Sequence, residues 1–288
     1  MSINRRHFLI SGAAAAASSI LDVQSAFAAV TGLQYAVIDF KTGKELVTQK
    51  AHTRRHPASL TKIMALYIVM RAMSDEDLDF NLNTQVLFPR DLTIRGGLAK
   101  FEAMDRGHKY KARDLLIGAG SRSDAYSVTC LAIHVSKLLD WGSGTNDSQN
   151  KFVDRMNYHA NRLGMKDTHF AVITGRPHPN NYSTPADIAK LVAALQRETP
   201  NLAEIALGQA SFDIHAISGS RTHTSGLLRR NPNNIHFAKT GFTNAAGRCL
   251  ATYSTVNGRQ MVSVVFGAKS ESERSSVTWN ILKKAAPL

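Results

Sequence analysis

The fold is organised around the stretch His56–Met64, HPASLTKIM, which opens an apolar run reaching Met73. This run is apolar nearly all round, a pattern typical of a buried helix. Ser59 and Lys62 are three residues apart, so a helix carries both side chains on one face. Burial favours the neutral form of a lysine, and a neutral amine can take the proton of a nearby serine hydroxyl. The alternative is structural: Ser59 caps the helix and Lys62 extends its amine to solvent.

An export signal precedes the folded part of the chain. Asn4–Ile10 is a basic head containing Arg5 and Arg6, Gly12–Ile20 is a weakly apolar core, and Ala26–Ala28 is a small-x-small cleavage site. The paired arginines and the modest apolar segment favour the twin-arginine route, with ordinary Sec export as the alternative. Residues 1–28 are therefore expected to be removed, which predicts a soluble protein of the periplasm.

Charge and cysteine content restrict the partners. The formal net charge is +13, and residues 1–28 contribute two arginines and one aspartate, so the exported part keeps nearly all of it. This balance favours an anionic wall polymer or membrane surface, with simple solubility as the alternative; export argues against nucleic acid. Cys130 and Cys249 are expected to be two separate buried thiols, although an oxidising compartment also permits a bridge.

The hydrophobic pattern predicts a mixed α and β fold. The chain from Leu33 to Val47 is expected to form a hairpin around a turn at residues 41–43. Helices are predicted after Ser59, from the 121–125 region to about 139, around 152–163, over 185–197 and over 275–285, with loops or short strands over 75–113 and a loop over 142–150. Strands are predicted at 235–240, 249–256 and 260–266. An antiparallel sheet built from both chain ends, with an inserted and mainly helical lobe, follows from this order.

Two further motifs follow Ser59 and Lys62. They are Ser121-Arg122-Ser123 and Lys239-Thr240-Gly241. This order resembles the penicillin-recognising serine enzymes, which share a β-lactamase/transpeptidase-like fold. The sequence around the motifs is similar to that of the low-molecular-mass D-alanyl-D-alanine carboxypeptidases, the smaller penicillin-binding proteins. The similar segments include Met156-Asn157, Leu163-Gly164-Met165 and Lys239–Gly247.

The resemblance implies a two-step acyl transfer on peptidoglycan stem peptides ending in D-Ala-D-Ala. Ser59 would attack the penultimate carbonyl and Lys62 would act as the general base. Ser121 would pass a proton toward the leaving amine. The backbone N–H groups of Ser59 and Phe242 would hold the oxyanion. β-Lactam antibiotics would acylate the same serine.

The third motif would bind the substrate. Lys239 and Thr240 would hold its free carboxylate, and Gly241 would let its backbone lie against the strand. The second motif departs from the family pattern, because Ser123 stands where an asparagine is expected. A serine hydroxyl also donates and accepts, but its reach is shorter. Substrate positioning, and the neutral state of Lys62, depend on this position.

Competing functions use the same residues. A D,D-endopeptidase acting on wall cross-links, a serine β-lactamase and a catalytically weak module that binds penicillin or the wall remain open. Glu198 starts the only segment between the second and third motifs that could serve a β-lactamase, and its local order differs from that enzyme's loop. Lys41-Thr42-Gly43 repeats the third motif's letters but fits a hairpin turn.

Neither a cofactor nor a metal is expected, since the histidines lack metal-ligand spacing. His215, His223 and His236 either surround the site or simply pack in the core or on the surface. Residues 29–288 are expected to form one catalytic domain without a C-terminal β-rich domain or membrane anchor.

Overall fold

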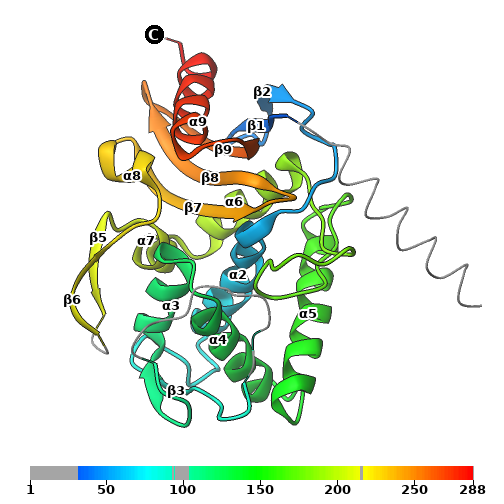
Figure 1. The fold of residues 1–288 in the computed structure, drawn as a ribbon, viewed down its shortest axis with the longest axis vertical. Coiled ribbons are helices and arrows are strands. Elements are labelled where there is room, and N and C mark those ends of the chain that lie inside the picture. Colours follow the sequence, from blue (N-terminus) through cyan, green and yellow to red (C-terminus); the bar gives the residue numbers. More distant parts are fainter. Residues whose placement is uncertain (1–31, 93, 95–103, 215–216, 288) are drawn as a thin grey trace, which may run out of the picture.

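The computed structural model describes residues 32–92, 94, 104–214 and 217–287. The predicted export signal, residues 1–28, lies outside them. A five-stranded sheet has the strand order β2-β1-β9-β8-β7 with antiparallel pairing throughout (Figure 1). The strands are β1 (Gln34–Asp39), β2 (Glu45–Gln49), β7 (Ile235–Thr243), β8 (Gly247–Val256) and β9 (Arg259–Ala268).

Both chain ends meet in this sheet, as the sequence predicted. β1 pairs with β9 from Gln34 opposite Phe266 to Asp39 opposite Met261. Asn257 and Gly258 both have positive φ, at 48° and 76°, which gives the tight turn joining β8 to β9. The first hairpin turns at Gly43, with φ 72°. Residues 41–43, which repeat the sequence of the third motif, therefore form a turn.

Helices cover the two faces of the sheet. Successive residues of β1 point to opposite sides: Val37 packs in a cluster with Leu282 of α9 (Glu271–Ala285), whereas Ile38 belongs to the main core. On that main-core side, α6 (Pro185–Glu198) contacts β1, β8 and β9. Pro185 lies in the first turn of α6, and the Thr184 hydroxyl caps it by accepting from Asp187 N.

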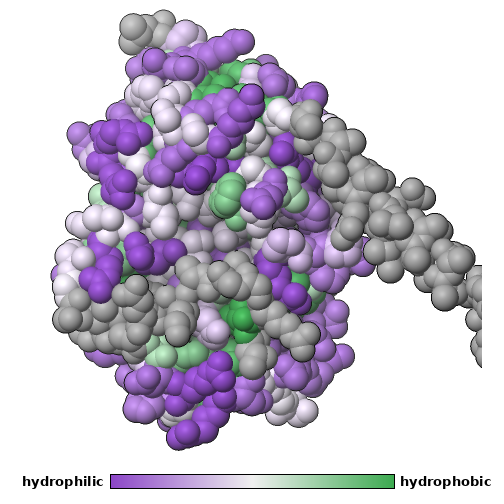
Figure 2. Space-filling model, in the orientation of Figure 1, coloured by the Kyte–Doolittle hydropathy of each residue, from purple (hydrophilic) through white to green (hydrophobic). Residues whose placement is uncertain are grey.

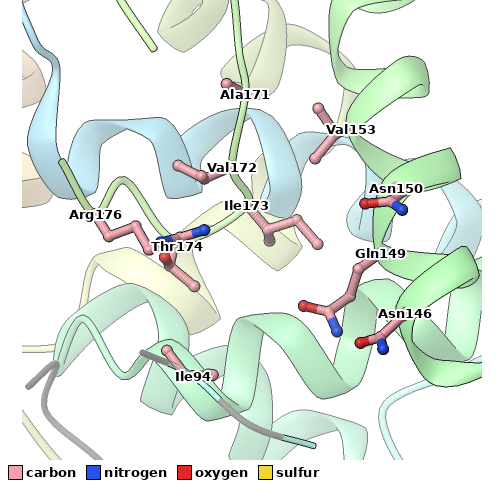
Figure 3. Close-up of a pocket in the computed structure, with 10 residues that line it drawn as sticks. All are labelled: Ile94, Asn146, Gln149, Asn150, Val153, Ala171, Val172, Ile173, Thr174 and Arg176. Atoms are coloured by element: carbon pink, nitrogen blue, oxygen red, sulfur yellow. The ribbon is translucent and has the colours of Figure 1, made fainter. Parts of the chain in front are cut away.

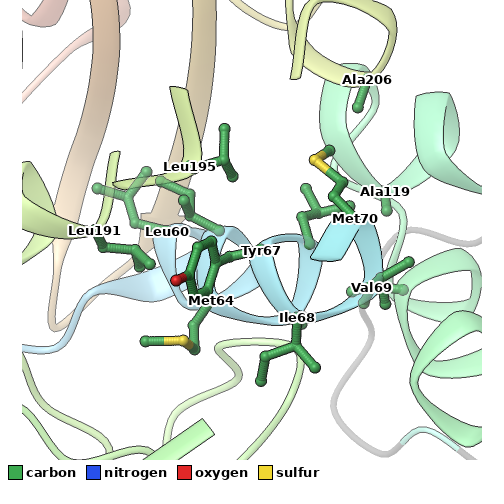
Figure 4. Close-up of a cluster of buried hydrophobic side chains, with 14 of the residues drawn as sticks. Leu60, Met64, Tyr67, Ile68, Val69, Met70, Ala119, Leu191, Leu195 and Ala206 are labelled. Atoms are coloured by element: carbon green, nitrogen blue, oxygen red, sulfur yellow. The ribbon is translucent and has the colours of Figure 1, made fainter. Parts of the chain in front are cut away.

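The inserted lobe surrounds α2 (Thr61–Met73), whose residues from Thr61 to Met70 are all buried. Its other elements are β3 (Gln85–Leu87), β4 (Lys109–Lys111), α3 (Ala112–Ser121), α4 (Ala125–Leu138), α5 (Thr145–Arg162) and α7 (Pro200–Leu207). Figure 4 shows Met64, Tyr67 and Met70 of α2 among Leu191 and Leu195 of α6 and Ala119 of α3. The turn that carries Ser59 directly precedes α2 and contacts β7, and Lys62 lies in the first turn of α2, so both residues are at the junction of lobe and sheet.

The structure corrects several predicted boundaries. Residues 145–150 are helical, because α5 starts at Thr145, where the Thr145 hydroxyl donates to Asp91 Oδ1 and Asp147 Oδ2 accepts from Ser143 N. The helix ends at Arg162, and Gly164 follows with φ 67°, as predicted. The sequence pattern also failed to predict α3, α7, the short helix α8 (Gly226–Arg230) and the hairpin of β5 (Ser211–Ile214) with β6 (Ile217–Thr222).

The two cysteines lie in the core. Cys130 and Cys249 are both buried and unpaired, so the prediction of two separate thiols is confirmed. The ungreyed part of the face in Figure 2 is mostly hydrophilic, with small hydrophobic patches. A search of the described helices finds none that is long and apolar enough to cross a bilayer. Nor does any group of three His, Cys, Asp or Glu side chains in the described ranges gather as a metal site would.

Candidate active site

A single turn of 3₁₀-helix, η1 (Ala58–Leu60), carries Ser59 into the site just before α2. Ala58 has a left-handed φ of 50°, which is strained for a residue with a Cβ. Gly175 packs so closely against this turn that a Cβ there would collide with the Ala58 carbonyl oxygen. Tertiary packing therefore fixes the backbone beside the Ser59 hydroxyl.

Lys62 lies one turn further on, with 1% of its surface exposed. Its Nζ is 3.0 Å from Ser59 Oγ and donates to the backbone oxygen of Thr174 at 2.6 Å. Burial lowers the pKa of Lys62 from its usual 10.5 to about 8, although the charge of Asp124 acts in the opposite direction. A substantial fraction of the amine is thus neutral near pH 8, and a neutral amine 3.0 Å from a serine hydroxyl can accept its proton.

The third motif lies on β7 beside the Ser59 turn. An added Cβ on Gly241 would be 3.1 Å from Ser59 N, so the glycine lets the strand approach the Ser59 backbone closely. Lys239 is completely buried, and burial together with the nearby Lys62 lowers its pKa well below the usual value. Phe242 is 54% exposed, and the guanidinium of Arg248 lies over its ring.

The second motif meets the third through Ser123. Lys239 Nζ donates to Ser123 Oγ at 2.7 Å and to the Thr240 backbone oxygen at 2.9 Å. Ser123 has a left-handed φ of 63°, a conformation in which asparagine is enriched several-fold over other side chains. Ser123 at this position therefore has a backbone cost that asparagine would reduce.

Ser121 is placed differently. It is the last residue of α3 and is fully buried, and its hydroxyl donates to the backbone oxygen of Ala206 in α7 at 2.8 Å. Its own backbone oxygen accepts from Thr224 N and Oγ1, and Thr240 Oγ1 donates to Thr224 Oγ1 at 2.8 Å. Ser121 thus links α3 to α7 and, through Thr224, to β7, while the hydroxyl that touches Lys239 is that of Ser123.

Three residues near the two lysines carried no signal in the sequence. Thr174 acts through its backbone carbonyl, which any residue type would supply. Asp124 caps α4 by accepting from Ser127 N at 2.6 Å, and its charge acts on Lys62. Arg274 of α9 is 4% exposed, its charge acts on Lys239, and its Nε has no hydrogen-bond partner among the described residues.

Asn157, one of the sequence landmarks, supports this site from a distance. Its amide accepts from Phe170 N and donates to Phe170 O, both at 2.8 Å. Asn181 binds the same segment at Ala171 N and also donates to Thr61 Oγ1. The segment that ends at Thr174 is therefore held on both sides before it reaches Lys62.

The histidines and Glu198 divide between core and surface. His223 is fully buried, and burial with the charge of Lys239 lowers its pKa to about 3, so it stays neutral. His236 is bonded to Thr255 Oγ1, and His215 lies outside the described residues. Glu198 accepts from Tyr67 Oη at 2.9 Å and pairs with Arg71. Tyr67 is eight residues beyond Ser59, or about 12 Å along a helix, so Glu198 does not face Ser59.

Comparisons with known proteins agree with this geometry. D-alanyl-D-alanine carboxypeptidase DacA of Escherichia coli is 30% identical over 253 residues, which cover 86% of this chain and 59% of that protein. A D-alanyl-D-alanine endopeptidase of Escherichia coli is 26% identical over 81% of this chain and 70% of that protein. The chain thus spans 59% of the length of the first of these relatives.

Solved structures show the same fold. A mutant of a Streptomyces DD-transpeptidase superposes with a TM-score of 0.77 at 24% identity, over 88% of this chain and 97% of that one. Penicillin binding protein 5 from Haemophilus influenzae gives 0.74 at 25% identity, over 87% of this chain and 69% of that one. The predicted β-lactamase/transpeptidase-like fold is therefore confirmed. The D-alanyl-D-alanine carboxypeptidase family model matches residues 22–270, so the chain belongs to that family.

Proposed function

We propose that this chain is a serine D,D-carboxypeptidase that removes the terminal D-alanine from peptidoglycan stem peptides. The observation that carries the proposal is the contact of 3.0 Å between Ser59 Oγ and a buried Lys62 amine whose pKa is about 8. Family membership supplies the substrate class. Export by the signal at residues 1–28 would bring the enzyme to the periplasm, where a basic surface suits an anionic wall or membrane.

The reaction begins at Ser59. Neutral Lys62 accepts the hydroxyl proton while its own N–H holds the Thr174 carbonyl, and Ser59 Oγ attacks the penultimate D-alanyl carbonyl. The backbone N–H groups of Ser59 and Phe242 stabilise the oxyanion. The close approach of Gly241 to Ser59 N supports this pairing of turn and strand. Water then hydrolyses the acyl-enzyme.

The leaving D-alanine lies toward β7. Its carboxylate binds the Lys239 amine and the Thr240 hydroxyl. The buried Arg274 guanidinium adds a positive charge from α9. Departure of the amine requires a proton at its nitrogen. We assign this transfer to the Ser123 hydroxyl in place of Ser121: Ser123 gives its proton to the amine and takes one from Lys239 Nζ, which donates to Ser123 Oγ, whereas the Ser121 hydroxyl is hydrogen-bonded to the Ala206 backbone oxygen. The proton that Lys62 took from Ser59 restores the protonation of Lys239, so the number of protons balances.

Geometry also ranks the alternatives. Glu198 is occupied by Tyr67 and Arg71, which argues against a β-lactamase that uses it to position water. A binding module without catalytic activity would not require the contact between the Ser59 hydroxyl and the buried Lys62 amine. An endopeptidase would use the same residues, and a curated endopeptidase is among the relatives, so substrate length separates these two activities.

Acylation by a penicillin tests the proposal. Intact mass spectrometry should find one stable adduct on the wild-type chain and none on Ser59→Ala, while a D-Ala-D-Ala peptide should release D-alanine from the wild type alone. Rapid turnover of the penicillin would indicate a β-lactamase. Absence of an adduct on correctly folded wild type would contradict the assignment of Ser59 as nucleophile.

A further inference from the structure

A cavity of about 300 Å³ lies between α5 and the segment Ala171–Arg176 (Figure 3). Its polar wall on α5 is made by Asn146, Gln149 and Asn150, which share one helix face because they are three and four residues apart. Arg176 stands on the other wall, beside Thr174. We call this cavity, with those three amides and Arg176, the amide pocket.

The amide pocket adjoins the reacting groups. Thr174 lines it, and the Thr174 carbonyl accepts from Lys62 Nζ at 2.6 Å. The same segment is clamped by Asn157 at Phe170 and by Asn181 at Ala171. One wall of the pocket is therefore preformed and fixed relative to the general base, as a substrate subsite requires.

The position of the amide pocket matches the acyl side of a substrate. Lys239, Thr240 and Ser123 mark the leaving-group side, near α3 and α4. In Figure 1, α3 and α5 lie on opposite sides of α2, which begins directly after the nucleophile turn. A peptide whose terminal carboxylate is bound at Lys239 thus extends its other end toward α5.

The lining selects the charge of its ligand. Among the described residues, the lining includes one arginine, three carboxamides and a threonine, but no Asp or Glu that could pair with a cation. Arg176 has no ion-pair partner within the described part of the chain. Val153 and Ile173 add apolar surface for methylene groups. These groups favour a carboxylate on a short aliphatic arm over an ammonium group.

We propose that the amide pocket binds a carboxylate-bearing side chain on the residue that precedes D-Ala-D-Ala. This inference rests on the proposed function and makes it more specific: the enzyme selects stem peptides by an acidic group on the acyl side. Arg176 contributes the charge, while the carboxamides of α5 fix the orientation of the acid.

Two peptides that differ by one group provide the test. Both end in D-Ala-D-Ala, and the preceding residue is glutamate in one and its near-isostere glutamine in the other. We expect kcat/KM of the wild type to favour the glutamate peptide by roughly ten- to a hundredfold, the range for one hydrogen bond to a charged group. Arg176→Gln should abolish the preference, because it should raise KM of the glutamate peptide more than KM of the glutamine peptide.

Arg162→Gln is the matched control, since Arg162 lies at the end of α5, outside the pocket lining, and stacks on Tyr158. It should keep the wild-type preference. Equal kcat/KM for both peptides in the wild type, or an equal loss for both in Arg176→Gln, would overturn the inference.

Binding to Ser59→Ala separates this inference from the proposed function. Its Kd for the two peptides, measured by calorimetry, does not depend on turnover. If the wild type hydrolyses neither peptide but Ser59→Ala still prefers glutamate in an Arg176-dependent way, the proposed function fails and the pocket stands. If binding shows no preference while hydrolysis occurs, the pocket assignment fails alone.

Discussion

The site has a sheet side and a lobe side, and they are built in different ways. On the sheet side, Lys239–Phe242 of β7 are held in register by β8, from Lys239 opposite Ala251 to Phe242 opposite Arg248. On the lobe side, the Ser121–Asp124 turn joins α3 to α4 and has a left-handed residue at Ser123. A ladder fixes every residue of a strand, whereas single tertiary contacts decide which hydroxyl of the turn reaches the lysines.

Because of this difference, we expect the two serines of the turn to behave in opposite ways when they are replaced: one variant should lose mainly activity and the other mainly stability. The loss of activity is the largest effect that we predict. Ser123→Ala should lower kcat for peptide hydrolysis about a hundredfold, because among the described residues the Ser123 hydroxyl is the only one that Lys239 Nζ contacts. The melting temperature should fall little, since Lys239 Nζ keeps its hydrogen bond to the Thr240 backbone oxygen. Alanine meets the same left-handed strain as serine, so the comparison isolates the hydroxyl.

Ser121→Ala is the counterpart of that variant. It leaves the buried Ala206 carbonyl without its donor and should reduce the free energy of unfolding by about 1–3 kcal/mol, with a smaller loss of kcat. Urea denaturation and steady-state kinetics on both variants provide the measurements. If Ser121→Ala loses the greater activity and Ser123→Ala loses little, the proton transfer belongs to Ser121.

The sequence allowed the sheet side to be predicted nearly completely. The strands at 235–240, 249–256 and 260–266 were predicted from hydrophobic runs and the Asn257-Gly258 turn, and the structure confirms them with longer ends. Ser59 and Lys62 could also be placed together, because their spacing fixes one helix face. Local periodicity is sufficient wherever the backbone is regular.

The lobe side was predicted less well for physical reasons. The segment 145–150 is rich in loop-forming residues, yet contacts of Thr145 with Asp91 and of Asp147 with Ser143 favour a helix there. The Thr174 carbonyl reaches Lys62 across 112 residues of sequence, and a backbone atom leaves no trace in residue identity. The resemblance assigned the proton transfer to Ser121, and the contact that occupies the Ser121 hydroxyl comes from α7, which was not predicted.

The charge of Asp124, on the lobe side, should help to set the pKa of Lys62. Because the pKa of Lys62 is about 8, the acylation rate should rise about tenfold per pH unit below 8 and level off above it. The Asp124 carboxylate stabilises the protonated amine, so Asp124→Asn should lower the pKa of Lys62. The rising part of the pH–rate profile should then move to lower pH. Asparagine caps helices as well as aspartate does, which preserves α4.

At pH 7 about a tenth of Lys62 is neutral in the wild type, so Asp124→Asn can raise the rate by at most about tenfold. Acylation by a penicillin, followed across the pH range around 8, gives both profiles. If the rising part of the profile stays in place in Asp124→Asn, or moves to higher pH, the Asp124 charge does not act on Lys62.

The smallest effect is expected at Glu198, the last residue of α6, which lies outside the site. Its pair with Arg71 joins two side chains that are each 40% exposed, so Glu198→Gln should change the free energy of unfolding by about 0–1 kcal/mol. Glutamine still accepts from Tyr67, and about 12 Å of helix separates that tyrosine from Ser59. The lifetime of the penicillin adduct on Ser59 should therefore match that of the wild type in a mass-spectrometric time course. A longer adduct lifetime in Glu198→Gln would mean that this carboxylate acts on the deacylating water, and the comparison between the two sides would then have to include α6.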